Sequence, residues 1–184
     1  MDTLPLWAYI AGGVVLVALL GVGGFFLGKA LWKAFVRRYL MRLIGGREGL
    51  LAGKRTLERV LSDVSAADVD GLVRFASDPN DEDRKALADL STNMQSLADE
   101  MALMPLPKRL WPAGEALSDV GTLMFQQTRA VAVAQDGEAA LSALLALDVE
   151  AVQNAADLAD ERLRIMGERY DMEEAAVYGG GLYI

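Results

Sequence analysis

The stretch that decides the fold is DEDRKALADLSTNMQSLADEMALM (residues 81–104). Its apolar residues recur with alternating spacings of three and four: Leu87, Leu90, Met94, Leu97, Met101 and Met104. That spacing places them on one face of an α-helix, so the stretch predicts an amphipathic helix with a buried side. Asn80 or Asp81 can cap its first turn, and Pro105 and Pro107 prevent its continuation.

Helical patterns also lie on both sides of this stretch. A short helix is predicted over residues 66–76, ended by Pro79. Another begins near Pro112 and ends near Ala134 with Leu117, Val120, Met124 and Val131 on one side, and a last one runs over residues 138–174. Since β-branched residues are sparse, the chain is predicted to be all-α, with a soluble up-down bundle of three to four helices.

Residues 33–63 form a basic segment with a helical stripe of their own. The stripe comprises Tyr39, Leu43, Gly46, Leu50, Gly53, Leu57 and Val60. Gly45, Gly49 and Gly53 recur every four residues, and Gly46 lies beside the first of them. Glycine costs about 1 kcal/mol relative to alanine inside a helix, so these positions indicate a hinge or a close helix contact. We expect a break at Gly45-Gly46; close packing against a partner helix is the alternative.

An apolar run without any ionisable group extends from Thr3 to Gly28. About 20 such residues match the roughly 30 Å hydrocarbon core of a bilayer, so the run predicts one N-terminal transmembrane helix. Trp7 and Trp32 stand near its two ends, where indole rings prefer the headgroup layer. A cleaved signal peptide is the alternative, but no basic residue precedes the run.

Charge is distributed very unevenly along the chain. Residues 28–60 carry nine basic and two acidic residues, a net charge of +7, whereas residues 61–184 carry nine basic and 23 acidic residues, a net charge of −14. Basic residues next to a span stay on the cytoplasmic side and attract anionic lipids, which predicts an outside N-terminus and a cytoplasmic C-terminal domain. The expected membrane-surface residues are Lys29, Lys33, Arg37, Arg38 and Arg42. The acidic domain is not expected to bind nucleic acid.

Two glycines of the run, Gly24 and Gly28, have the spacing that lets two membrane helices approach closely. This spacing is compatible with a homo-oligomer or with a partner subunit, although glycine is also common in spans that have neither.

The chain end YGGGLYI (residues 178–184) carries apolar Leu182 and Ile184 beside the terminal carboxylate. Such an end could be recognised by a groove of another protein, or it could be an ordinary chain end.

The chain contains neither cysteine nor histidine. Thiolate and imidazole catalysis and the usual zinc, haem and iron–sulfur sites are therefore excluded, and we expect neither an enzyme nor a cofactor.

Asp148 falls on the stripe of the last helix and is the candidate buried carboxylate, with Arg129 as its partner. A weaker alternative is a divalent-metal site of Asp157, Asp160, Glu161 and Glu168, which a solvated charged face explains equally well.

These observations predict four segments: an anchor (1–32), a basic juxtamembrane helix (33–63), an acidic bundle (64–175) and a tail (176–184). The stretch from Met101 to Met166 resembles the Pro-punctuated, Ala/Leu-rich hairpins of membrane-anchored bacterial proteins, a generic likeness that carries no site residue. We expect a scaffold or accessory subunit that binds proteins through its helices. A sensor that relays a signal through the transmembrane helix is the alternative.

Overall fold

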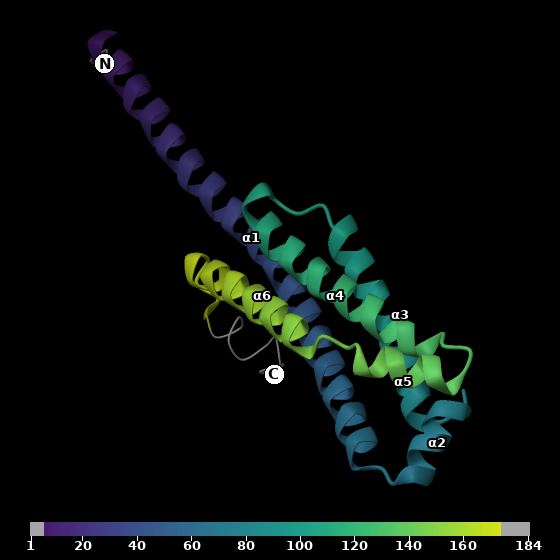
Figure 1. Cartoon of the computed structure of the whole chain (residues 1–184). Coiled ribbons are helices and arrows are strands. Elements are labelled where there is room, and N and C mark those ends of the chain that lie inside the picture. Colours follow the sequence, from purple (N-terminus) through teal and green to yellow (C-terminus); the bar gives the residue numbers. More distant parts are fainter. Residues whose placement is uncertain (1–5, 174–184) are drawn as a thin grey trace. The chain divides into compact units, whose positions relative to one another are not determined.

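The computed structural model describes the backbone of residues 6–173 and side chains from residue 20 onward. Within these limits every regular element is a helix, which confirms the all-α prediction (Figure 1). The elements are α1 (Leu6–Ala66), α2 (Val69–Ser77), α3 (Glu82–Leu103), the 3₁₀-helix η1 (Lys108–Leu110), α4 (Trp111–Ala132), α5 (Gly137–Leu145) and α6 (Val149–Arg169).

Contacts divide the chain into two compact units, residues 1–38 and residues 39–184. The second unit is a helical bundle, as predicted, and its four long members are α3, α4, α6 and the part of α1 from Tyr39 onward. Successive long members run in opposite directions (Figure 1). The bundle begins earlier than the expected residue 64 because α1 itself supplies core residues: Leu40, Leu43, Ile44, Leu50, Leu57 and Val60.

The predicted stripes form most of this core. On α4, Leu117, Val120, Met124 and Val131 are all buried, and on α3 Leu87, Leu90, Met94 and Met101 are buried. Gly121 of α4 brings the backbones of α3 and α4 close together, since a Cβ on it would lie 3.3 Å from the backbone oxygen of Met94. The α3–α4 contact is therefore closer than a side chain at position 121 would permit.

Aspartates begin four of the helices. Asp68, Asp81, Asp136 and Asp148 each accept a hydrogen bond from a backbone N–H in the first turn of α2, α3, α5 and α6. This satisfies a donor that has no partner inside the helix and places a negative charge at the positive helix end. Pro112 lies in the first turn of α4, where its missing N–H costs nothing.

The single long helix predicted over residues 138–174 is wrong. The chain breaks after Leu145, and α6 begins at Val149 with Asp148 as its cap. At the end of α5, Leu144 is buried whereas Leu145, which lies on the predicted stripe, is exposed, so the stripe does not continue as one buried face into α6. Asp148 is accordingly exposed rather than buried, and its Oδ1 accepts the Ala151 N–H at 2.8 Å.

The expected break at Gly45-Gly46 is also not found, since α1 runs through both residues as one helix. Among the residues that the structure describes, no helical stretch is both long and apolar enough to cross a membrane. The predicted transmembrane helix depends on the apolar run of residues 3–28. Most of that run, residues 3–19, lies outside the residues with described side chains. The tail residues Leu182 and Ile184 lie outside the described residues as well.

Candidate protein-docking groove

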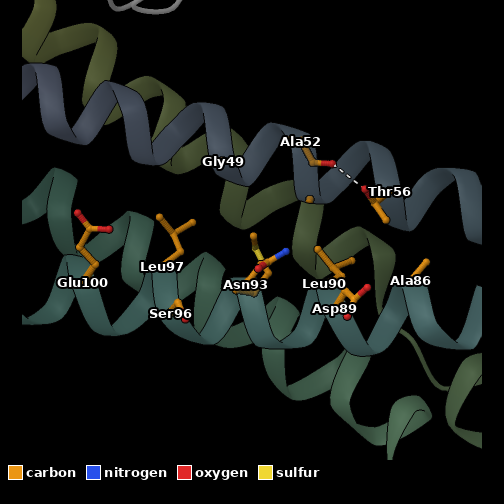
Figure 2. Close-up of a pocket in the computed structure, with 12 residues that line it drawn as sticks. Gly49, Ala52, Thr56, Ala86, Asp89, Leu90, Asn93, Ser96, Leu97 and Glu100 are labelled. Atoms are coloured by element: carbon orange, nitrogen blue, oxygen red, sulfur yellow. Dashed lines mark hydrogen bonds between the residues drawn. The ribbon is translucent and has the colours of Figure 1, made fainter.

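A groove of about 600 Å³ runs between α1 and α3 on the surface of the bundle (Figure 2). We call it the α1–α3 groove. Its residues are Gly49, Ala52, Gly53 and Thr56 of α1 and Ala86, Asp89, Leu90, Asn93, Met94, Ser96, Leu97 and Glu100 of α3. Because both helices lie in the compact unit of residues 39–184, the groove is a feature of the bundle itself.

Two glycines allow α1 and α3 to meet beneath the groove. A Cβ on Gly46 would lie 3.2 Å from the Cε and Sδ atoms of Met101, and one on Gly53 would lie 2.9 Å from the Cε atom of Met94. Gly46 and Gly53 are both buried. At these two positions glycine makes room for methionine tips in the helix contact, and no hinge is involved.

Two further glycines of α1 have no such neighbour. A Cβ on Gly45 or on Gly49 would meet no atom within 4 Å, and both residues are exposed. Gly49, Ala52 and Thr56 form a line of small residues along one edge of the groove, which we call the small-residue edge. Gly45 lies one turn before Gly49 on the same face of α1, outside the residues that line the groove. The Thr56 hydroxyl donates to the Ala52 carbonyl at 3.1 Å and so projects little from the helix (Figure 2). Another helix could approach α1 closely along this edge.

The opposite edge of the groove is polar and acidic. Asp89, Asn93, Ser96 and Glu100 of α3 line the groove and are exposed along one helix face (Figure 2). Within the described part of the chain, neither Asp89 nor Glu100 forms an ion pair. These groups can accept hydrogen bonds and attract Lys or Arg of a bound chain.

Arg47, one turn before Leu50 on α1, fixes α1 to α6. Its Nε donates to Oδ1 of Asp160 at 2.7 Å and its Nη2 donates to Oδ2 at 3.1 Å. The hydrogen bond with Asp160 raises the pKa of the Arg47 guanidinium, so this guanidinium stays protonated at all ordinary pH values. The helix that forms the small-residue edge is thereby held on its other side.

Sequence reasoning missed Arg84, the one arginine that is buried among the described residues, at 3 % exposure. Its guanidinium donates to the carbonyls of Ala76 at 3.3 Å, Val131 at 3.3 Å and Ala134 at 2.8 Å. These carbonyls end α2 and α4, where the helix dipole favours a cation. A basic residue at the start of α3 gives no sequence signal for this role, because its partners are backbone groups distant in sequence.

The four carboxylates of the metal alternative are occupied by side chains of the protein. Asp160 pairs with Arg47, Glu161 and Glu168 pair with Arg164, and Asp157 accepts from Gln153 at 2.6 Å. Arg164 lowers the pKa of the Glu161 carboxyl through a direct hydrogen bond. Over the residues described, no group of three or more acidic side chains is arranged to hold a metal ion.

The expected Asp148–Arg129 pair is not formed either. Arg129 instead lies over the ring of Phe125, 5.4 Å from its centroid. The contact from α4 to Asp148 comes from Gln127 instead of Arg129. The Gln127 Oε1 accepts the backbone N–H of Asp148 at 3.1 Å. Gln127 thus links α4 to the start of α6 through the backbone, which a search for opposite charges does not reveal.

The remaining candidate residues lie on α1. Gly24 and Gly28 are exposed and a Cβ on either would meet no atom within 4 Å. Of the basic residues, Lys29, Arg38 and Arg42 are exposed, whereas Lys33 and Arg37 are half-buried. Arg42 lies over the ring of Tyr39 at 5.9 Å from its centroid.

Comparison with known proteins adds no assignment. No protein-family model matches the sequence, and neither the curated proteins nor the solved structures include a significant match. The class that the structure itself defines is a helical bundle with a surface groove between two of its helices.

Proposed function

We propose that this protein is a membrane-anchored interaction protein whose α1–α3 groove binds a helix of a partner. The observation that carries the proposal is the small-residue edge beside an acidic edge. Two exposed glycines cost α1 about 2 kcal/mol of helix stability, at about 1 kcal/mol each. Among the residues that the structure describes, nothing packs on Gly45 or Gly49, so the described contacts do not account for these two glycines. No catalytic step or cofactor belongs to the proposal.

The anchor part of the proposal depends on the apolar residues of the first unit. From Leu20 to Leu31 large apolar side chains are exposed, among them Phe25 at 69 % and Leu31 at 71 %. Continuous with the uncharged run that begins at Thr3, they favour a lipid environment for this helix. The basic residues that follow favour a cytoplasmic bundle held beside an anionic inner leaflet.

The proposed occupant of the groove is an α-helix with small or short side chains toward α1 and Lys or Arg toward α3. The small-residue edge lets its backbone approach, and Asp89 and Glu100 attract its basic residues. That helix can belong to another protein or to a second copy of this chain, and the two cases differ in the mass of the cross-linked product.

Photo-cross-linking from the groove tests this proposal. Because the chain has no cysteine, Asn93→Cys can carry a single benzophenone label in the full-length protein in native membranes. We expect one predominant cross-linked species, and Ala52→Leu should reduce it several-fold by filling the small-residue edge. Ala130→Leu makes the same change at an exposed site of α4 outside the groove and should leave the yield unchanged. Equal yields in the two leucine variants would contradict the proposal.

The anchor is tested separately. We expect the full-length chain to resist extraction from membranes by alkaline carbonate and a C-terminal reporter to be active only in the cytoplasm. Extraction into the soluble fraction would contradict the anchor, and a reporter active outside would contradict the orientation.

The sequence also allowed a signal-transmitting module with a joint at Gly45-Gly46. Because α1 is unbroken there, no observation favours that function.

A further inference from the structure

The connection between α3 and α4 carries an exposed apolar and basic tip. Leu103 is 82 % exposed and Trp111 is 50 % exposed, and between them lie the exposed cations Lys108 and Arg109. From Met101 to Gly114 the chain contains no acidic residue, although residues 61–184 have a net charge of −14. We call residues 103–111 the α3–α4 tip; it is a basic interruption of an acidic surface.

The tip lies at the end of the bundle where the chain enters from its N-terminal side. A Cβ on Gly114 would meet Leu106 of the tip on one side and Leu43 of α1 at 3.9 Å on the other. Met101, just before the tip, contacts Gly46 of α1. The opposite end of the bundle holds α2 (Figure 1), whose residue Ala76 lies against Gly137 of α5.

We propose that the α3–α4 tip is a second membrane contact that inserts Leu103 and Trp111 among the headgroups of an anionic bilayer. This inference depends on the proposed anchor. The expected span ends near Gly28, and ten residues of helical α1 separate Gly28 from Tyr39, the first residue of the bundle unit. Even fully extended, ten residues reach no more than about 35 Å, so the chain itself limits how far the entering end of the bundle can lie from the end of the span.

The chemistry of the tip matches that surface. Indole rings favour the headgroup layer, and Lys and Arg beside anionic lipid contribute about 1 kcal/mol each. In the described part of the chain neither Lys108 nor Arg109 has an acidic partner, so both charges are available to phosphate groups. The Trp111 Nε1 donates to the Leu106 carbonyl at 2.9 Å, which holds the ring beside the connection. Pro105 and Pro107 limit the freedom of the same segment.

The test measures the depth of one side chain in the membrane. Full-length Leu103→Cys carries a spin label and is reconstituted in vesicles of phosphatidylcholine with a minor fraction of phosphatidylglycerol. We expect a several-fold higher ratio of oxygen to nickel-chelate accessibility than for Val69→Cys, which labels an exposed site of α2 at the far end. Adding Lys108→Glu and Arg109→Glu should lower the ratio at position 103 toward the Val69→Cys value.

The outcomes separate this inference from the anchor. If the chain resists carbonate extraction but the Leu103→Cys label is as exposed to the nickel chelate as the Val69→Cys label, the second contact is wrong and the anchor remains. If carbonate removes the chain, both are wrong. If the label is shielded from the nickel chelate but unaffected by the two glutamates, a surface other than anionic lipid covers the tip, and the inference is overturned.

Discussion

Arg47 of α1 and Asp160 of α6 form a two-point ion pair, 113 residues apart in sequence, with N–O distances of 2.7 and 3.1 Å. The Arg47 side chain is 15 % exposed and that of Asp160 is 38 % exposed. Partial burial reduces screening by water, and the two parallel hydrogen bonds fix the geometry. The pair therefore couples the helix that borders the groove to the last helix of the bundle.

A double-mutant cycle with Arg47→Ala and Asp160→Ala should give a favourable coupling of about 1–2 kcal/mol in urea unfolding. The Arg164–Glu161 pair within α6 is the control, and its coupling should be smaller because both side chains are more exposed to water, at 47 % and 51 %. A coupling no larger than that of the control would mean that the Arg47–Asp160 pair does not fasten α1 to α6.

Arg84→Met should destabilise the bundle by about 2–4 kcal/mol, because it leaves the carbonyls of Ala76, Val131 and Ala134 without their donor. Arg84→Lys should also destabilise it, since one ammonium group cannot reproduce a planar guanidinium that reaches three acceptors. Lys85→Met, at the adjacent exposed position, is the control and should change the free energy of unfolding by less than about 0.5 kcal/mol. Unchanged unfolding of both Arg84 variants would remove the role that we assign to this residue.

The sequence predicts the helices and most of the core because both follow from local spacing. Leu117, Val120, Met124 and Val131 lie on one stripe and are all buried. The break before Asp148 was missed because the apolar spacing continues through it, and an aspartate on a stripe can equally be a helix cap. Periodicity identifies a face and does not show whether the helix is interrupted.

The groove could be predicted only in part. Four glycines of α1 stood out in the sequence, but their roles depend on phase against a helix that lies elsewhere in the chain. Gly46 and Gly53 contact methionines of α3, whereas Gly45 and Gly49 face outward. Gly45 and Gly46 differ by about 100° around the helix, and Gly49 and Gly53 by only about 40° over one turn, so a small change of angle decides between the two environments. Arg84 could not be predicted because its acceptors are backbone carbonyls.

An exposed glycine of α1, Gly49, and a glycine of α4 that is close to another backbone, Gly121, give a matched pair of alanine substitutions. Gly49→Ala should raise the free energy of unfolding by about 0.5–1 kcal/mol, because its Cβ meets nothing and alanine favours helix. Gly121→Ala should lower it by about 1–3 kcal/mol, because its Cβ would lie 3.3 Å from the Met94 backbone oxygen and 3.4 Å from the Ala98 backbone nitrogen. Effects of the same sign in urea unfolding would contradict the assigned α1 and α4 environments.

The last prediction concerns Asp83 in the first turn of α3. Burial, and then the nearby Asp63 carboxylate, raise the pKa of the Asp83 carboxyl above its usual 3.8, although Arg59 lies 3.4 Å away and opposes the shift. The folded state therefore binds this proton more tightly than the unfolded state does. It follows that ionised Asp83 destabilises the fold, and that this contribution grows as the pH rises from about 3.8 through the raised pKa.

Asp83→Asn removes this ionisation. Its free energy of unfolding relative to the unmodified protein should increase as the pH is raised from below 3.8 through the raised pKa and then stay constant. Urea unfolding at a series of pH values measures this difference directly. Asp89→Asn, at an exposed position of the same helix, controls for the general loss of one negative charge. If the Asp83→Asn difference instead decreased with rising pH, the folded structure would favour the ionised carboxylate, and Arg59 rather than burial would dominate its environment.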